Sequence, residues 1–205
     1  MMNSCHGTLG HSVNNAMITR VKPVIFPLIS DVMDKDVFVG LSTVSSYLEI
    51  GVSDGFSLEC RLREHFNMHK IVLCDTWKAT DGGTNRGNHK HIEKILTEWN
   101  YPLERVVFLD GRSQDTLPEY FDQYPDELFD LVFVDGDHTG HGLWVDLQNV
   151  FDHSRIIAVH DIRNVAHGYL RDVLYAFYET VREQCVLLDD GADLGIMIKK
   201  YLFQW

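Results

Sequence analysis

The sequence has no cysteine cluster, no excess of positive charge and no long apolar run, and each absence excludes a class of protein. Its four cysteines lie far apart in 205 residues, so a disulfide framework and a zinc knuckle are both disfavoured. Acidic residues outnumber basic ones by 30 to 18, and the formal net charge of -12 disfavours nucleic acid and anionic membranes as partners. No segment has membrane-spanning length or the form of a signal peptide. We therefore expect a cytoplasmic protein that binds a small molecule.

Two hydrophobic periods alternate along the chain from residue 47 onward. Short apolar runs rich in β-branched residues are followed by stretches in which apolar residues recur at helical spacing, as around Leu58, Ile92, Leu143 and Leu170. This alternation is typical of an α/β fold with a parallel sheet, and a content of 45% hydrophobic residues is enough for one domain with a substantial core. The predicted strands are 47–50, 71–74, 105–109, 131–134, 155–159, 185–188 and 194–198.

The two ends of the chain depart from this alternation. The last two predicted strands are joined by the segment DDGAD, which is too short for a crossover helix, so they form an antiparallel hairpin at the end of a mostly parallel, seven-stranded sheet. Residues 1–45 show no comparable rhythm and are predicted to be a flank of helices and loops, with the domain itself in residues 46–205. The polar, glycine-rich segment 76–88 is long enough to predict a lid or binding loop.

The segment YLEIGVSDGFS, residues 47–57, predicts a turn that holds a ligand between a strand and a helix. Its pattern is Glu49-x-Gly51-x-x-x-Gly55. Glycines allow positive φ and a close approach of the backbone, and the helix that follows offers unpaired N–H groups. The dinucleotide fingerprint G-x-G-x-x-G requires glycine at position 53, where this chain has Ser53, so a different nucleotide-like ligand is indicated.

Polar residues also follow the other predicted parallel strands, at the sheet edge where ligands bind in such folds. Asp75 follows the second strand and is placed to accept hydrogen bonds from a ribose. A hydroxyl and an amide follow the third strand, in the segment DGRSQ. The segments DGDH, 135–138, and HD, 160–161, follow the fourth and fifth strands. Each has an ordinary explanation as a helix cap, but their agreement at five strand ends favours a binding site.

These motifs resemble those of the class I S-adenosylmethionine-dependent methyltransferases, in the subgroup with DGDH after the fourth strand and HD after the fifth. The resemblance spans roughly residues 45 to 200 and rests on LEIGVSDG, LCDTW, GRSQDTLPEY, DLVFVDGDHTGHGLWVDL and IIAVHDI. It extends to catechol and macrolide O-methyltransferase-like enzymes and implies a Rossmann-like fold with S-adenosylmethionine as cofactor. The cofactor-binding residues that it implies are Glu49, Gly51, Ser53, Gly55, Asp75, Thr76, Ser113, Gln114 and Asp135.

The resemblance also implies a divalent metal site at Asp135, His160 and Asp161. His160 departs from the related enzymes, which carry an acidic residue at that position. Magnesium prefers oxygen ligands, whereas a histidine favours manganese, iron or zinc. Both a metal-dependent and a metal-independent enzyme therefore remain open.

Methyl transfer needs a base that removes the proton of the acceptor. His138 is the first candidate because the pKa of an unperturbed histidine lies near neutral pH, and Asp137 is the second. The resemblance implies transfer to a hydroxyl oxygen of a small molecule or sugar. The aromatic residues Tyr201, Phe203 and Trp205 favour a homodimer, because exposed aromatic side chains otherwise leave apolar surface in water.

Two other functions remain open from the sequence. His138, His160 and Asp161 make up the two-histidine, one-carboxylate set of a metal-dependent oxygenase, or of a hydrolase on the same scaffold. A non-catalytic nucleoside-binding protein is the other alternative, because FDHSRII replaces the usual Pro-Gly-Gly turn before the fifth strand. Of the remaining histidines nearby, His141 and His167 are predicted on the ligand side, and His153 is predicted to be solvated at the far end of the sheet.

Overall fold

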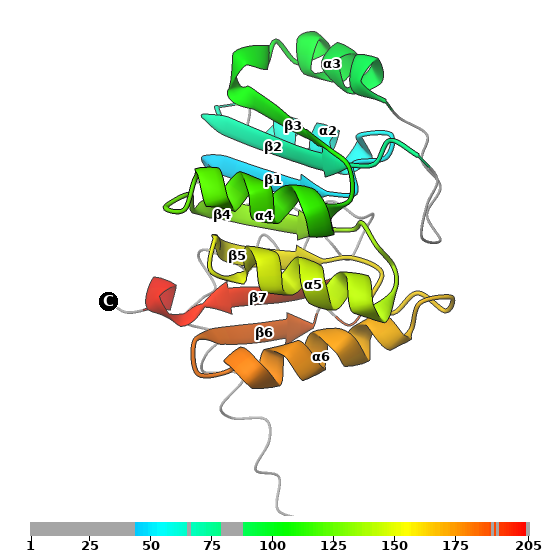
Figure 1. The fold of residues 1–205 in the computed structure, drawn as a ribbon, viewed down its shortest axis with the longest axis vertical. Coiled ribbons are helices and arrows are strands. Elements are labelled where there is room, and N and C mark those ends of the chain that lie inside the picture. Colours follow the sequence, from blue (N-terminus) through cyan, green and yellow to red (C-terminus); the bar gives the residue numbers. More distant parts are fainter. Residues whose placement is uncertain (1–43, 65–66, 79–87, 190, 192, 204–205) are drawn as a thin grey trace, which may run out of the picture.

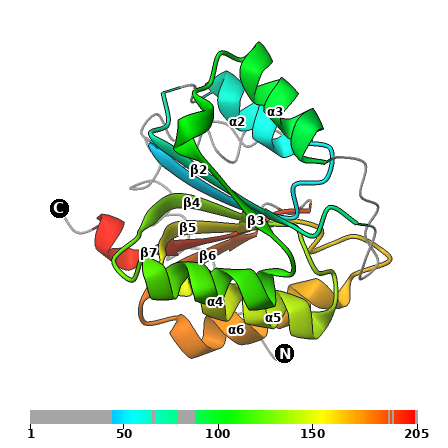
Figure 2. The same ribbon diagram turned by 45° about the horizontal axis from the view of Figure 1, so that its top comes forward.

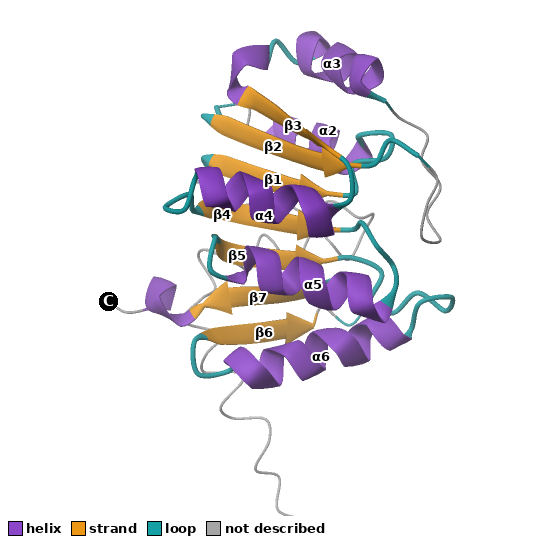
Figure 3. Cartoon of the chain, in the orientation of Figure 1, coloured by secondary structure: helices purple, strands orange, loops and turns teal. Residues whose placement is uncertain are grey.

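The computed structural model describes residues 44–64, 67–78, 88–189, 191 and 193–203. These residues form one seven-stranded sheet with helices on both faces (Figure 1 and Figure 3). The predicted N-terminal flank, apart from its last two residues, and most of the predicted loop 76–88 lie outside the described residues. Among the described residues, none of the helices combines the length and the apolar character that crossing a bilayer requires.

The strand order in the sheet is β3-β2-β1-β4-β5-β7-β6, and β7 pairs in antiparallel fashion with both β5 and β6. All seven predicted strands are confirmed to within two residues at each end, and so is the antiparallel hairpin. Residues rich in Val, Ile and Leu form the central strands because both of their faces are buried. The strands are β1 Ser46–Ile50, β2 Lys70–Asp75, β3 Val106–Asp110, β4 Phe129–Val134, β5 Ser154–Val159, β6 Cys185–Asp189 and β7 Gly195–Lys199.

The helices form two layers, one on each face of the sheet (Figure 2). Helices α2 Phe56–Glu64 and α3 His89–Glu98 cover one face. Helices α4 Ser113–Gln123, α5 Gly140–Phe151 and α6 Tyr169–Val181 cover the other. Short 3-10 turns occupy Leu103–Arg105 and Lys200–Phe203. Helix α4 was not predicted as a helix, because Pro118 lies within it and its apolar residues span fewer than two turns.

The core is divided by the sheet, and β1 contributes to both halves. Tyr47 packs on the side of α2 and α3, whereas Leu48 and Ile50 pack on the side of α4, α5 and α6. This alternation follows from the two-residue period of a strand, and all five residues of β1 are buried. The carboxyl end of this rigid central strand is where the predicted glycine turn begins.

Candidate functional site

A cavity of about 230 Å³ opens at the carboxyl ends of the parallel strands, next to the point where the strand order reverses between β1 and β4. Ligands of open α/β sheets bind at such switch points. Residues that follow β1, β2, β3, β4 and β5 all contribute, so the predicted convergence of strand ends is confirmed. The lining residues are Ile50, Gly51, Ser53, Cys74, Asp75, Thr76, Lys78, Gly111, Arg112, Ser113, Gln114, Asp135, Gly136, Asp137, His138, His160 and Asp161.

The glycine turn lies against the end of β4, and this contact requires Gly51. Its φ is +83°, and a Cβ atom there would lie 2.1 Å from the backbone oxygen of Asp135. No other residue fits this close approach without moving the backbone. Gly55 also has positive φ, but its missing Cβ faces Ile92 and Ile95 of α3. Gly51 therefore lines the cavity, whereas Gly55 lets α3 pack and does not line it.

Asp75 braces the glycine turn from the neighbouring strand β2. Its Oδ2 accepts hydrogen bonds from the backbone N–H groups of Val52, at 2.8 Å, and Ser53, at 2.9 Å. Its Oδ1 accepts a hydrogen bond from Trp77 N at 2.5 Å. Asp75 lines the cavity together with Ser53 and Thr76, as expected for cofactor-binding residues. The carboxylate thus has a structural task in addition to any contact with a ligand.

Glu49 lies beneath the cavity rather than in its wall. Its side chain is fully buried on the α2 side of β1, where it accepts hydrogen bonds from Tyr47 and Ser57. Burial raises the pKa of Glu49 to about 8. Glu49 is therefore separated from the predicted cofactor residues that line the cavity. Its hydrogen bonds instead link the strand and the helix on either side of the glycine turn.

Two carboxylates hold the polar residues at the start of α4. Ser113 Oγ donates a hydrogen bond to Asp146 Oδ1 at 2.5 Å, and Gln114 Nε2 donates one to Asp137 Oδ2 at 3.2 Å. Asp137 Oδ1 also accepts Thr139 N at 2.9 Å, so the Asp137 carboxylate is engaged on both oxygens. This engagement makes Asp137 a link between the starts of α4 and α5 rather than a free base.

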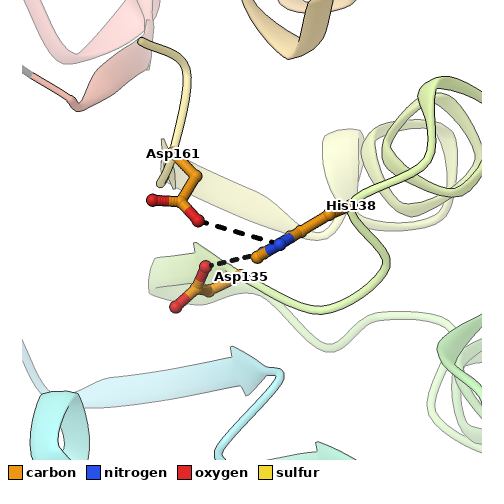
Figure 4. A group of neighbouring side chains, drawn as sticks. All are labelled: Asp135, His138 and Asp161. Carbon is orange, nitrogen blue, oxygen red and sulfur yellow. Dashed lines mark hydrogen bonds and ion pairs between the residues drawn. The ribbon is translucent and has the colours of Figure 1, made fainter. Parts of the chain in front are cut away.

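His138 lies between two carboxylates that follow β4 and β5 (Figure 4). Its Nε2 is 3.1 Å from Asp135 Oδ1, and its Nδ1 is 3.7 Å from Asp161 Oδ2. The hydrogen bond to Asp135 raises the pKa of His138 above its ordinary value, against the effect of burial. Burial would raise the pKa of Asp135, but hydrogen bonds from His138 and His160 lower it instead. The result is a charged cluster at the β4–β5 end of the cavity.

Metal-ligating atoms come together in two groups that share Asp161. One group is Asp135, His138 and Asp161, and the other is His160, Asp161 and Asp193, each with ligand atoms within 4.8 Å of one another. His160 Nδ1 is also 3.3 Å from Asp135 Oδ1. Burial lowers the pKa of His160, but Asp135 outweighs it and raises that pKa to about 9. Each group that the described residues form holds one histidine and two carboxylates, so the two-histidine set predicted for an oxygenase is not among them. The predicted metal set of Asp135, His160 and Asp161 is not one of the two groups either, although His160 Nδ1 also lies 3.4 Å from Asp161 Oδ1.

The β6–β7 hairpin holds the loop that carries Asp161. Asp161 has φ of +58°, a strained value for a residue other than glycine. After it, Ile162 N donates to the backbone oxygen of Asp193 at 3.2 Å, and Arg163 N donates to Asp193 Oδ1 at 2.8 Å. Asp189 then accepts hydrogen bonds from the Arg163 guanidinium at 2.7 and 2.9 Å. The strained backbone is thus fixed by contacts from the end of β6 and from the turn that leads to β7.

The other histidines are placed differently. His167 lies near the site, with its ring centroid 4.7 Å from that of His138, as predicted. His141 is exposed on α5 and does not line the cavity. His153 lies at the far end of the sheet as predicted, but it is half-buried there, because it stacks on Phe121 with centroids 3.7 Å apart. The apolar ring of Phe121 provides a partner that the local sequence does not reveal.

Several residues of the site were not predicted from the sequence. Lys78 and Arg112 bring positive charge into the cavity wall. Each follows a strand end at which only acidic or uncharged polar residues were predicted to bind a ligand. Asp146 was missed although a signal was present: it stands within the apolar stripe Leu143, Leu147 and Val150. An acidic residue on the apolar face of a helix departs from the pattern that packing favours, and such departures are typical of functional sites.

Comparisons with known proteins agree with this geometry. Residues 48–162, more than half of the chain, match a family model described as a methyltransferase domain. The chain is similar in structure to CalS11, a TDP-rhamnose 3'-O-methyltransferase of calicheamicin biosynthesis, with a TM-score of 0.59 and 15% identity over 95% of this chain and 96% of that one. It is also similar to the O-methyltransferase NovP, with a TM-score of 0.59 and 17% identity over 89% of this chain and 80% of that one.

A third structure is that of TomG from Streptomyces achromogenes, an O-methyltransferase solved in complex with SAM. It gives a TM-score of 0.54 and 16% identity over 92% of this chain and 96% of that one. A search of curated proteins gives no significant match. Identities this low establish a shared fold, whereas the family match establishes membership. The chain belongs to the methyltransferase-domain family and has the fold of the class I S-adenosylmethionine-dependent methyltransferases.

Proposed function

We propose that this protein transfers a methyl group from S-adenosylmethionine to a hydroxyl oxygen of a small molecule or sugar. The observation that carries the proposal is the position of His138, which is held by Asp135 at the edge of the switch-point cavity. The O-methyltransferases named above share the fold and support the choice of oxygen as the acceptor atom. S-adenosylmethionine supplies a methyl group on a sulfonium, which is already activated for displacement.

The strand order suggests how the cofactor lies in the cavity. β3 and β5 stand on opposite sides of the β2–β1–β4 centre, so Ser113 and Gln114 lie toward one end and His138 and Asp161 toward the other. We place adenine at Ser113 and Gln114, the ribose at Asp75 and the reacting methyl at His138. The Asp75 carboxylate lines the cavity and can accept hydrogen bonds from ribose hydroxyls as well as from the glycine turn, since an ionised carboxylate has about four acceptor positions.

His138 is suited to remove the acceptor proton through Nδ1. Its Nε2–H donates to Asp135 at 3.1 Å, which fixes the tautomer and leaves the Nδ1 lone pair free to accept a proton. Asp161, at 3.7 Å from Nδ1, is too far for a strong hydrogen bond but close enough to stabilise the imidazolium that forms. Methyl transfer needs little more than this base and the alignment of donor and acceptor.

The same end of the cavity fits a divalent cation. Either Asp135 and Asp161 supply oxygen ligands with a nitrogen ligand from His138, or Asp161 and Asp193 do so with His160, and both sets suit manganese, iron or zinc better than magnesium. A cation held there would lower the pKa of the acceptor hydroxyl. His138 cannot both ligate a cation through Nδ1 and accept a proton on that atom. Activity that is lost in EDTA and restored by Mn²⁺ would show that transfer needs a cation, and activity unchanged by EDTA would leave His138 as the base.

The proposal is tested with the His138→Ala variant and the exposed His141→Ala as a matched control. Removal of a general base typically lowers the rate by about 10²–10⁴-fold, so we expect kcat to fall by at least about 100-fold. The affinity for S-adenosylhomocysteine should stay within a few-fold in isothermal titration, because Ser113 and Asp75 are untouched. His141→Ala should keep kcat. Turnover within a few-fold of the wild type in His138→Ala would exclude this histidine as the base.

The two alternative functions give different results in the same assays. A non-catalytic nucleoside-binding protein would bind S-adenosylhomocysteine but transfer no methyl group to any hydroxylated acceptor in a panel. A metal-dependent oxygenase or hydrolase would be stabilised by a divalent metal and not by S-adenosylhomocysteine. Binding together with transfer is the outcome that supports the proposal.

A further inference from the structure

We propose that Asp146 fixes the hydroxyl of Ser113 as a hydrogen-bond acceptor, and that the adenine end of the cavity thereby selects a 6-amino purine over a 6-oxo purine. Asp146 is a positioning residue in this proposal and Ser113 is the residue that contacts the ligand. The proposal rests on the proposed function, because it assumes that adenine lies at Ser113 and Gln114.

The first observation is the position of Asp146 in the core. On α5 it follows Leu143 by three residues and precedes Val150 by four, so it belongs to the helix face that packs on the sheet. Its relative exposure is 0%. An ionised carboxylate is costly to bury, and a leucine at this position would extend the apolar face of the helix without that cost. Packing alone therefore gives no reason for an acid here.

The second observation is that the Asp146 carboxylate has few hydrogen-bond partners among the described residues. Its Oδ1 accepts one hydrogen bond, from Ser113 Oγ at 2.5 Å. Its Oδ2 is buried and has no hydrogen-bond partner among the described residues. The charges that face it are the carboxylate of Asp137 and the guanidinium of Arg112. The Ser113 hydroxyl is thus the one donor that this part of the structure aims at Asp146, and a short bond to a carboxylate is strong.

The chemistry of a hydroxyl gives this bond a consequence for the ligand. A serine hydroxyl has one proton, and here that proton is donated to Asp146. Only lone pairs then remain for other partners, so Ser113 can only accept a hydrogen bond in the cavity that it lines. The 6-amino group of adenine is a donor, whereas the 6-oxo group of hypoxanthine is an acceptor. Ser113 can therefore form a hydrogen bond with the 6-amino group of adenine. With the 6-oxo group of hypoxanthine it cannot, because both oxygens are then acceptors and repel each other.

Gln114 beside it does not have this fixed polarity. Its Nε2 donates to Asp137 at 3.2 Å and its Oε1 accepts from Arg112 Nε at 3.1 Å. The amide keeps one further donor and one further acceptor, so it can pair with either purine edge. We therefore assign the selectivity to the pair of Ser113 and Asp146.

The experiment is isothermal titration of S-adenosylhomocysteine and of its 6-oxo analogue S-inosylhomocysteine. Burial raises the pKa of Asp146 to about 7, so the titrations are done at pH 8.5, where the carboxylate is charged. For the wild type we expect the amino ligand to bind about 30-fold more tightly, which is typical of one mismatched buried hydrogen bond. In Asp146→Asn the amide can donate to Ser113 or accept from it, and we expect the ratio to fall to about 3-fold.

Ser113→Ala is the second variant and removes the hydroxyl itself. We expect it to lower the ratio to a similar value, and the double variant Asp146→Asn/Ser113→Ala to lower it no further, since both act through one group. Equal weakening of both ligands by Asp146→Asn, with the ratio unchanged, would show a merely structural acid and overturn the proposal, as would an unchanged ratio in Ser113→Ala. A wild type that binds neither ligand would instead overturn the proposed function.

Discussion

Asp135 acts on two histidines at once, and this gives His138 a pKa that can be measured directly. Its Oδ1 lies 3.1 Å from His138 Nε2 and 3.3 Å from His160 Nδ1. Asp135 stabilises the charged form of His138, so His138 should lose its proton above the ordinary pKa of about 6.5. A base must be neutral to accept a proton, so the rate of methyl transfer should rise as the pH passes through the raised pKa of His138.

The prediction concerns the pKa of His138 in the ligand-free protein. An NMR titration of its Cε1–H should give a pKa above about 6.5 in the wild type. In Asp135→Asn the raising contact is lost while burial still disfavours the imidazolium, so the pKa should fall. The exposed His141 serves as an internal reference for the chemical shifts. An unchanged pKa for His138 in Asp135→Asn would contradict the assigned cause.

At this scale the sequence predicted which residue types gather at the site, but not what each one does. Asp75, Ser113 and Asp135 line the cavity, as expected from their places after the strands. Glu49 stands in the same motif as Gly51, but the two-residue period of β1 sends its side chain into the core. Asp137 has its carboxylate engaged by Gln114 and Thr139. Hydrogen-bond partners from other segments decide these roles, and they are not encoded locally.

At the scale of elements, the β6–β7 hairpin controls the loop after β5. Asp189 is 12% exposed and accepts hydrogen bonds from Arg163, Arg171 and Tyr175. This contact fixes the loop two residues after Asp161, whose backbone is strained. The hairpin therefore stabilises the geometry of the His138 cluster although none of its described residues lines the cavity.

Asp189→Asn should separate catalysis from cofactor binding. An asparagine directs its amide donors at the arginines, so we expect the free energy of unfolding, from urea denaturation, to fall by about 1–3 kcal/mol. kcat should fall because Asp161 is less well held, whereas the Kd of S-adenosylhomocysteine should change less than about two-fold, since the glycine turn and Asp75 are far along the sheet.

The matched control for Asp189→Asn is Glu179→Gln, which breaks the exposed pair of Glu179 and Arg182 on α6. Exposed pairs contribute about 0–1 kcal/mol, so both stability and kcat should be nearly unchanged. An Asp189→Asn protein that lost cofactor affinity as much as kcat would show general loosening of the fold instead of a local effect on the loop.

The hairpin itself was predicted from the length of DDGAD, but its contact with the loop after β5 was not. The contact could not be predicted because β7 lies between β5 and β6, and because the contact joins the side chains of residues 26 positions apart. Helix α4 was not predicted for a local reason: Pro118 lies inside it, and proline usually ends or interrupts a helix. Local periodicity thus predicted the strands well and the connections between distant segments poorly.

For the whole molecule, binding of the cofactor product should appear as added stability. S-adenosylhomocysteine at 100 times its Kd should raise the free energy of unfolding by about 2.7 kcal/mol, because it binds only the folded state. For a domain of this size the melting temperature should rise by roughly 5–10 °C. NAD is the control, since the chain lacks the dinucleotide fingerprint. A larger shift with NAD than with S-adenosylhomocysteine would contradict the cofactor assignment.

The predicted homodimer remains a prediction, which sedimentation velocity can test. Of the three aromatic residues on which it rests, only Tyr201 has a described side chain, and it is 47% exposed. The net charge of -12 opposes self-association at low salt, so any dimer should strengthen as salt is added.

The position of β7 in the sheet determines when the sheet can be completed during synthesis of the chain. β7 is the last of these seven strands to leave the ribosome, yet it lies inside the sheet and covers the hydrogen-bonding edge of β5. Until it arrives, β5 presents an open apolar edge, and nascent chains with such edges are prone to wrong pairing. Chains released before residue 195 should therefore aggregate, even though every strand of the parallel half has already been made.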